Sequence, residues 1–310
     1  MTKLLVTGAS GLLGINLALL AHARGYEVIG WTNQHTLRNA PFATESVDLL
    51  QYDQIAGKLD ALKPDLIINC AAIANVDVAA QDPKLAHEVN GLVPGVLATE
   101  AARIGAKFVH ISTDAVFDGI RGDYTETDMP NPHNVYAFTK LEGERAVYKA
   151  NPDAIIARVV FYGWSLSGTR SLSEFFYNHL IAEQPVKGFT DMFFTPLYAG
   201  HLAEILLRMA AKDLKGAWHV FGAAALSKYA FGVSLAREFG FDETLVSPVS
   251  TPEGDESVRR SLRLTMKTDK LAEALGEDLP TIGEGLAALR TDLHNGLRDK
   301  IRALGEGSEA

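Results

Sequence analysis

A glycine-rich segment at residues 8–14 constrains the fold of this chain more than any other feature. It reads GASGLLG, and it stands between a short apolar run at residues 3–7 and an amphipathic stretch at residues 12–24. Glycine lets a backbone turn tightly, approach a bound diphosphate closely and direct helix N–H groups at it. Because the segment follows a predicted strand and opens a predicted helix, it predicts a loop that binds the diphosphate of a dinucleotide.

The first 165 residues alternate between short apolar runs and helical periodicity. We predict strands at residues 3–7, 26–31, 47–49, 65–70, 107–112 and 154–160, and helices at residues 12–24, 52–62, 83–104 and 134–148. Strands that are apolar on nearly every position and alternate with helices indicate a parallel sheet covered on both faces. The predicted fold class is therefore α/β, a doubly wound parallel sheet of the Rossmann-like kind with a smaller α+β C-terminal substrate lobe.

The pattern changes after residue 165. Helical stretches at about residues 171–183, 198–212, 227–239 and 281–303 are joined by irregular segments, with one strand-like run at residues 217–221. We predict a dinucleotide-binding domain over residues 1–165 and a mainly substrate-binding lobe over residues 166–304, with part of 190–222 returning to the sheet. Residues 305–310 are expected to form a frayed tail.

Composition argues against several other kinds of protein. The 310 residues carry 29 Lys plus Arg against 38 Asp plus Glu, a net charge of −9 that argues against a nucleic-acid partner. A single cysteine, Cys70, excludes an internal disulfide framework, and the histidines show no HxH or HExxH spacing, so no metal is expected. No apolar run approaches the roughly 18 residues that a membrane span needs, so we expect no membrane partner and a cytoplasmic location.

The segment after the second predicted strand bears on the choice of cofactor. NAD sites usually place an acidic residue there for the ribose 2′-hydroxyl, yet residues 28–44 contain none. Thr32, His35 and Arg38 offer hydrogen bonds and positive charge instead, which favours the 2′-phosphate of NADP, with NAD as the alternative. After the third strand, Asp48 is positioned to accept from the adenine amino group, with Leu49 beside it.

Tyr136 and Lys140 are four residues apart on a predicted helix, so both project from one face of it. This helix follows the strand that ends in Ser112, Thr113 and Asp114. In a doubly wound sheet, ligands bind at the carboxyl ends of the strands, which is where these residues should lie.

Four motifs together resemble those of an extended short-chain dehydrogenase/reductase: TGASGLLG at 7–14, NCAA at 69–72, STDAVF at 112–117 and YAFTK at 136–140. Longer segments, NCAAIANVDVAAQDP at 69–83, YTETDMPNPHNVYAFTKLEGE at 124–144 and TDMFFTPLYAGHLAEIL at 190–206, resemble the dTDP-4-dehydrorhamnose reductase family. The resemblance is strong from residue 3 to about residue 165 and thinner in the second lobe.

The resemblance implies the reduction of a ketone by hydride from a nicotinamide. Tyr136 would donate the proton, and Lys140 would favour the phenolate by its charge and hold the nicotinamide ribose. Thr113 would align the substrate oxygen. Asn90 matches the position of a proton-relay asparagine in many short-chain reductases.

The expected site residues fall into three groups. The catalytic residues are Thr113, Tyr136 and Lys140. The cofactor-binding residues are Gly8, Ser10, Gly11, Leu12, Leu13, Gly14, Thr32, His35, Arg38, Asp48, Leu49, Ala71, Ala72, Asn90, Tyr136 and Lys140. The substrate contacts are Thr113, Trp164 and Arg170.

One departure from the family pattern leaves alternatives open. The rhamnose reductases usually carry Tyr after Ser-Thr-Asp, and this chain has Ala115, so its sugar pocket is altered. The Asp-Glu pair of related dehydratases is also missing, which argues against elimination chemistry. The favoured reading is an NADP-preferring reductase of a 4-keto nucleotide-sugar, a homodimer by family resemblance. The alternatives are a non-catalytic NADP-binding protein resembling the regulatory subunit of methionine adenosyltransferase, and a sugar-nucleotide epimerase.

Overall fold

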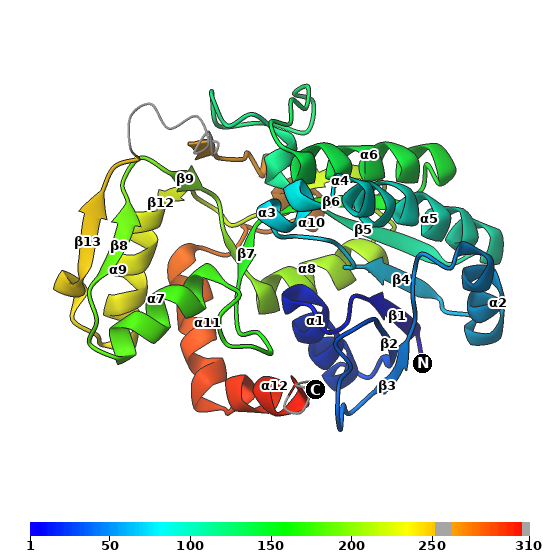
Figure 1. Ribbon diagram of the computed structural model, residues 1–310, viewed down its shortest axis with the longest axis horizontal. Coiled ribbons are helices and arrows are strands. Elements are labelled where there is room, and N and C mark those ends of the chain that lie inside the picture. The colour runs from blue at the N-terminus through cyan, green and yellow to red at the C-terminus, as the bar shows by residue number, and fades with distance from the viewer. Residues whose placement is uncertain (252–261, 306–310) are drawn as a thin grey trace.

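The computed structural model describes residues 1–251 and 262–305, and a sheet of seven parallel strands organises it (Figure 1). The strands are β1 (Lys3–Thr7), β2 (Glu27–Thr32), β3 (Ala43–Ser46), β4 (Leu66–Asn69), β5 (Lys107–Thr113), β6 (Ile155–Val159) and β11 (Gly216–His219). Their order is β11-β6-β5-β4-β1-β2-β3. The order reverses between β1 and β4, which opens a crevice at the carboxyl ends of these strands. The predicted doubly wound fold is confirmed.

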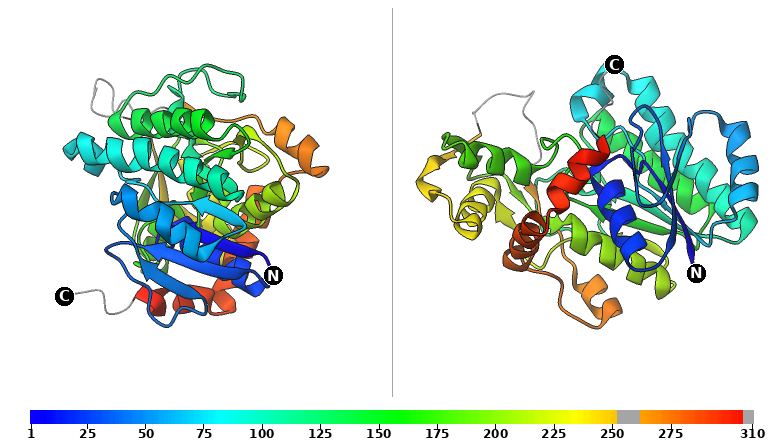
Figure 2. Two further views of the ribbon diagram at one scale, coloured as in Figure 1. Left: turned by 90° about the vertical axis from the view of Figure 1, so that its right-hand side faces the viewer. Right: turned by 90° about the horizontal axis from the view of Figure 1, so that it is seen from below.

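Helices cover both faces of this sheet. One face carries α1 (Leu12–Ala23), α8 (Ala199–Ala211) and the C-terminal α12 (Leu297–Gly305), whose apolar side chains share one core. The other face carries α2 (Tyr52–Leu62), α5 (Val93–Ile104) and α6 (Val135–Ala150), packed over a second core. Figure 2 shows α12 lying beside α1, so the first and last helices of the described chain are neighbours.

The C-terminal lobe stands at the left of Figure 1 and has a different construction. Its helices are α7 (Leu172–Ile181), α9 (Lys228–Phe239) and α11 (Ile282–His294), whereas α10 (Asp269–Leu275) packs against β11 of the large sheet. Its short strands form three small sheets: β8 (Val186–Phe189) with β13 (Val246–Val249); β9 (Phe193–Phe194) with β12 (Leu226–Ser227) and β14 (Arg263–Leu264); and β7 (Phe161–Tyr162) with β10 (Leu197–Tyr198). Aromatic rings hold this lobe together, with Phe231 fully buried against Tyr162, Phe176 and Phe194.

Three expectations about individual elements are wrong. The third strand is Ala43–Ser46 and not residues 47–49, because β3 is an exposed edge strand whose side chains form no apolar run. The helix expected at 83–104 is split into α4 (Pro83–Ala86), a π-helical turn η1 (His87–Leu92) and α5, and a separate α3 (Val76–Gln81) precedes them. The helix expected at 281–303 breaks at Gly296, whose φ of 74° lies outside the helical region.

The chain passes between the sheet and the lobe more than once. After residue 165 it builds α7 and β8 in the lobe, then returns with α8 and β11 to the sheet, and ends in α12 against α1. The amide N–H of Arg38 donates to the carbonyl of Leu304 over 2.9 Å, which ties the loop after β2 to the last helix. Gly305 closes α12, and the rest of the expected frayed tail, residues 306–310, lies outside the described residues.

Candidate active site

The glycine loop is packed so closely that side chains would not fit. Gly8 has a φ of 63°, and a Cβ there would lie 2.8 Å from the Cα of Ala71. A Cβ on Gly14 would lie 2.2 Å from the carbonyl oxygen of Gly8, and the Gly11 amide donates to the same oxygen over 2.8 Å. Loop, strand β4 and helix α1 are therefore in backbone contact.

This cradle fits a dinucleotide diphosphate. Helix α1 begins at Leu12 after the N-cap residue Gly11, and its first turn contains no acidic side chain. The first N–H groups of a helix carry partial positive charge, and here no carboxylate competes for them. Leu13 is buried and anchors the helix, while Ser10 and Leu12 stay partly exposed at the loop.

Polar side chains hold the end of β4 beside this loop. Asn69 accepts from the Thr7 hydroxyl over 2.6 Å and from the Ala71 amide over 3.3 Å. Asn90, fully buried in the π-helical turn, accepts from the Ile73 amide over 2.9 Å and donates to the Ile73 carbonyl over 3.1 Å. The Asn90 side chain thus fixes the backbone just beyond Ala71 and Ala72.

The residues expected near the adenosine lie at the ends of β2 and β3. Thr32 is buried, whereas His35 and Arg38 are exposed on the loop that follows it. The Asp48 carboxylate accepts from the Leu50 amide over 3.0 Å, so it caps its own turn. Leu49 is half-buried next to it.

Thr113 and Tyr136 meet at the carboxyl end of β5. The Thr113 side chain, 5% exposed, lies beside the phenol of Tyr136 on the first turn of α6 and acts to lower the pKa of that phenol. Burial raises the pKa of Tyr136 to about 12, and the charge of Asp114 acts in the same direction. Tyr136 is therefore a phenol at neutral pH, the form that a proton donor needs.

Lys140 contacts strand β5 in this structure, and its effect on the pKa of Tyr136 stays a prediction. Its Nζ donates to the Ile111 carbonyl over 2.6 Å and lies 3.4 Å from Nε2 of His110. Burial lowers the pKa of Lys140 to about 8. The lysine is held one turn below Tyr136, against strand β5.

His110 links Lys140 to the β4 end, a role that the sequence did not reveal. The side-chain amide of Asn69 donates to His110 Nδ1 over 3.1 Å, and burial together with the charge of Lys140 holds the pKa of His110 well below its usual value. His110 is thus neutral, and side chains from β1, β4, β5 and α6 form one buried polar chain.

A second polar group that sequence reasoning missed lies beneath the catalytic residues. Arg158 on β6 pairs with Glu144 on α6 in a bidentate ion pair, with distances of 3.0 and 2.8 Å, and both residues are buried. Ser112 donates to the same carboxylate over 2.5 Å. The available signal was an arginine inside an otherwise apolar strand and a glutamate four residues after Lys140.

The two expected substrate contacts from the lobe differ in exposure. Trp164 has no exposed surface, and its indole N–H donates to the Leu289 carbonyl over 3.2 Å. Its ring packs in the apolar core, and its assignment to the substrate stays a prediction. Arg170 is exposed, and its amide donates to Glu174 over 2.9 Å.

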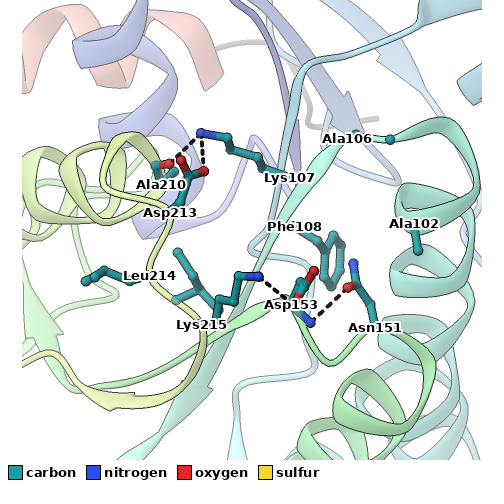
Figure 3. Close-up of a pocket in the computed structure, with 12 residues that line it drawn as sticks. Ala102, Ala106, Lys107, Phe108, Asn151, Asp153, Ala210, Asp213, Leu214 and Lys215 are labelled. Atoms are coloured by element: carbon teal, nitrogen blue, oxygen red, sulfur yellow. Dashed lines mark hydrogen bonds and ion pairs between the residues drawn. The ribbon is translucent and has the colours of Figure 1, made fainter.

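A groove of about 550 Å³ lies away from this site, at the amino ends of β5, β6 and β11 (Figure 3). Lys107 pairs with Asp213 over 2.6 Å, and Lys215 pairs with Asp153 over 2.7 Å. Each lysine is thus neutralised by a carboxylate, and the groove offers no surplus charge.

Within residues 1–251 and 262–305, no three His, Cys, Asp or Glu side chains gather closely enough to hold a metal ion. Across the same residues, no helix is long and apolar enough to cross a membrane.

A parallel sheet with a glycine cradle at its switch point, and an adjacent Thr–Tyr pair two strands away, defines a dinucleotide-binding protein of the short-chain dehydrogenase/reductase class. Comparison with known proteins narrows this class. Residues 1–295 match the model of the RmlD substrate binding domain, so the chain belongs to the RmlD substrate-binding domain family. The predicted family is confirmed, and with it the oxidoreductase class of its named relatives.

Three similar proteins illustrate the family. The probable low-salt glycan biosynthesis reductase Agl14 of Haloferax volcanii is 34% identical over 289 residues, covering 92% of this chain and 96% of the relative. Methionine adenosyltransferase 2 subunit beta of Mus musculus is 30% identical over 312 residues, covering 96% and 87%. The crystal structure of dTDP-4-dehydrorhamnose reductase from Bacillus anthracis, in complex with NADP, superimposes with a TM-score of 0.83 at 24% identity, covering 94% of this chain and 100% of that one.

Proposed function

We propose that this protein is an NADP-preferring reductase of a 4-keto nucleotide-sugar, with Tyr136 as the proton donor. The observation that carries the proposal is the position of Thr113 beside Tyr136 at the carboxyl edge of β5. This edge neighbours the end of β4, against which the glycine loop is packed. A hydride donor held by the loop and a carbonyl bound by the hydroxyl pair would therefore lie next to each other.

The cofactor would be held by the cradle and by the ends of β2 and β3. The N–H groups from Gly11 to Leu13 would bind the diphosphate, and His35 and Arg38 would bind the 2′-phosphate. Bound NADPH would supply the hydride for the carbonyl carbon. The related reductase crystallised with NADP supports this choice.

The residues of this chain would manage the proton and the geometry. Thr113 would orient the carbonyl oxygen, and Tyr136 would transfer its phenolic proton to that oxygen as charge develops on it. Lys140, freed from the Ile111 carbonyl, would bind the ribose hydroxyls of the cofactor. Asn90 would hold the backbone after β4 in the conformation that the nicotinamide half of the cofactor requires.

The named relatives support a nucleotide-sugar as the substrate class, because one acts in glycan biosynthesis by name and another is a dTDP-4-dehydrorhamnose reductase. Ala115 removes the tyrosine that usually follows Ser-Thr-Asp and leaves room for a different sugar. A pair of chains is the assembly that we expect.

A second candidate is a regulatory subunit without turnover. The similarity to methionine adenosyltransferase 2 subunit beta and the altered residue Ala115 favour it. The adjacent Thr113 and Tyr136 favour the enzyme, because regulation alone requires no proton donor.

The decisive experiment measures NADPH oxidation with a panel of 4-keto nucleotide-sugars, with NADH assayed in parallel. The proposal expects turnover of at least one sugar and a higher kcat/KM with NADPH than with NADH. Tightly retained NAD(H) without net oxidation would indicate an epimerase. No turnover, combined with stoichiometric binding to a methionine adenosyltransferase catalytic subunit, would indicate the regulatory protein.

A further inference from the structure

Asp114 is a buried carboxyl group that the mechanism above does not use. It follows Thr113 directly, where β5 turns into a short 3₁₀ helix (Asp114–Val116), and it is 6% exposed. The Thr113 hydroxyl lies 3.1 Å from its Oδ1. Thr113 also lies beside Tyr136 and acts to lower the pKa of its phenol, so the three groups follow one another from the carboxyl to the phenol.

The hydroxyl of Thr113 has one proton and two lone pairs to share among its neighbours. The Ala115 amide donates to it over 3.2 Å and takes one lone pair. One proton and one lone pair remain for Asp114 and Tyr136, so the hydroxyl donates to one of them and accepts from the other.

The protonation state of Asp114 decides which way this chain points. If Asp114 is ionised it can only accept, so Thr113 donates to it and the phenolic proton of Tyr136 turns toward Thr113. If Asp114 is protonated it can donate to Thr113, which then donates to the Tyr136 oxygen. In that second arrangement the phenolic proton is free to face a substrate carbonyl.

We propose that Asp114 is the proton source that restores Tyr136 after each reduction, acting through the hydroxyl of Thr113. This inference rests on the proposed reductase function. It assigns to Asp114 the task of keeping the tyrosine in its donating orientation and of replacing the proton that leaves with the product.

The proton steps balance along the chain. The Tyr136 O–H bond breaks as its proton joins the oxygen of the reduced carbonyl. The Thr113 O–H proton then passes to the phenolate, and the Asp114 carboxyl proton passes to Thr113. Asp114 is left as a carboxylate and takes a proton from water, while NADPH is the reductant of the ketone.

Titratable groups on two other elements face Asp114. Burial raises its pKa to about 7, and the hydrogen bonds from Thr113 and from backbone amides, together with the charge of Lys228 on α9, act in the opposite direction. Tyr136 on α6 faces it from the other side. Reduction requires the protonated form, which is fully present well below the pKa and is lost as the pH rises through it.

The test is Asp114→Asn, which keeps the size and hydrogen-bonding capacity of the side chain but carries no transferable proton. In the wild-type enzyme, kcat for reduction should fall as the pH rises above about 7. In the variant this descending limb should disappear, and kcat at pH 6 should drop about tenfold or more. Asp153→Asn, a matched change at an exposed site in the amino-end groove, should leave kcat and its pH profile unaltered.

A double variant checks that Thr113 connects the two groups. Thr113→Val removes the hydroxyl, so adding Asp114→Asn to it should cause no further loss of kcat. Equal and additive losses, or an Asp114→Asn enzyme that keeps the wild-type descending limb, would overturn the proposal.

An infrared measurement on the wild-type protein separates this inference from the proposed function. With ¹³C-labelled aspartate, a protonated carboxyl band should be present at pH 6 and should disappear by pH 8. If no such band titrates, Asp114 is not the proton source, whatever the turnover. If the band titrates but no keto-sugar is reduced, the proposed function fails instead.

Discussion

The carboxyl edge of the sheet and the C-terminal lobe are stabilised in different ways. At the sheet edge, backbone contacts too close for a Cβ and buried hydrogen bonds fix individual atoms, as at Gly14, Asn69 and Glu144. In the lobe, tilted and edge-to-face aromatic rings such as those of Phe231 and Tyr162 fill the interior. The first kind of packing specifies positions, whereas the second mainly excludes water.

This difference indicates which part of the molecule tolerates amino-acid substitutions. An unpaired buried polar group or a clash with backbone is costly, whereas apolar groups of similar volume exchange at low cost. Substitutions at the sheet edge should therefore impair function, whereas the lobe should tolerate substitutions that suit different sugars. Four substitutions test this contrast.

The largest effect should come from Tyr136→Phe, which removes the proposed proton donor from the sheet edge. Turnover of the keto-sugar should fall by a factor of roughly 10² to 10⁴, the usual contribution of a general acid. The NADPH Kd, measured by fluorescence titration, should change little. Tyr148→Phe, an exposed tyrosine on the same helix, should keep full activity. A Tyr136→Phe enzyme with wild-type kcat would contradict the mechanism.

Gly14→Ala should act through backbone contact alone. The new Cβ would lie 2.2 Å from the Gly8 carbonyl oxygen, so α1 must move away from the loop. We expect a loss of roughly 1–3 kcal/mol in the free energy of unfolding in urea, with weaker NADPH binding. Gly57→Ala on α2 has open space around it and should leave the protein as stable or slightly more stable. Equal effects of Gly14→Ala and Gly57→Ala on the free energy of unfolding would contradict this prediction.

Phe231→Leu tests the lobe side of the comparison. Phe231 has no exposed surface, and its ring packs 5.0 Å from that of Tyr162 and 5.8 Å from that of Phe194. The free energy of unfolding should fall by roughly 1.5 kcal/mol or less, since volume is largely conserved. The NADPH Kd should be unchanged. A tenfold weaker Kd would show that lobe packing controls the cofactor edge.

The smallest effect concerns pH and His219, which is fully buried on β11 with Nδ1 3.2 Å from the Lys267 carbonyl. Burial lowers the pKa of His219 to about 4. An unfolded chain binds a proton at this histidine below about pH 6.5 and the folded chain does not, so stability is lost as the pH falls below 6.5.

Between pH 7.5 and pH 6, His219 should account for about 1 kcal/mol of that loss, measured by urea unfolding. His219→Gln should remove this share, and His294→Gln, an exposed histidine that ends α11, should not. An unchanged pH dependence in His219→Gln would place the titrating group elsewhere.

The sequence was sufficient for features that depend on local pattern. The glycine spacing, the apolar strands and the Tyr136–Lys140 spacing predicted the fold class and brought the candidate residues to one edge of the sheet. Features set by distant contacts were not predictable. His110 reads as one more residue of a strand, and only the pairing of β4 with β5 puts it beside Asn69. The contact between Trp164 and Leu289 of α11, more than a hundred residues later in the sequence, was not predictable either.

The bond between the Arg38 amide and the Leu304 carbonyl has a consequence for how the protein is made. A ribosome completes the glycine loop and the loop after β2 long before it reaches Leu304, the partner of Arg38. The loop after β2 can therefore be fixed in this way only after α12 has been made. A nascent chain stopped before α12 would contain the glycine loop but would lack the hydrogen bond from Arg38 to Leu304 that fixes the loop after β2.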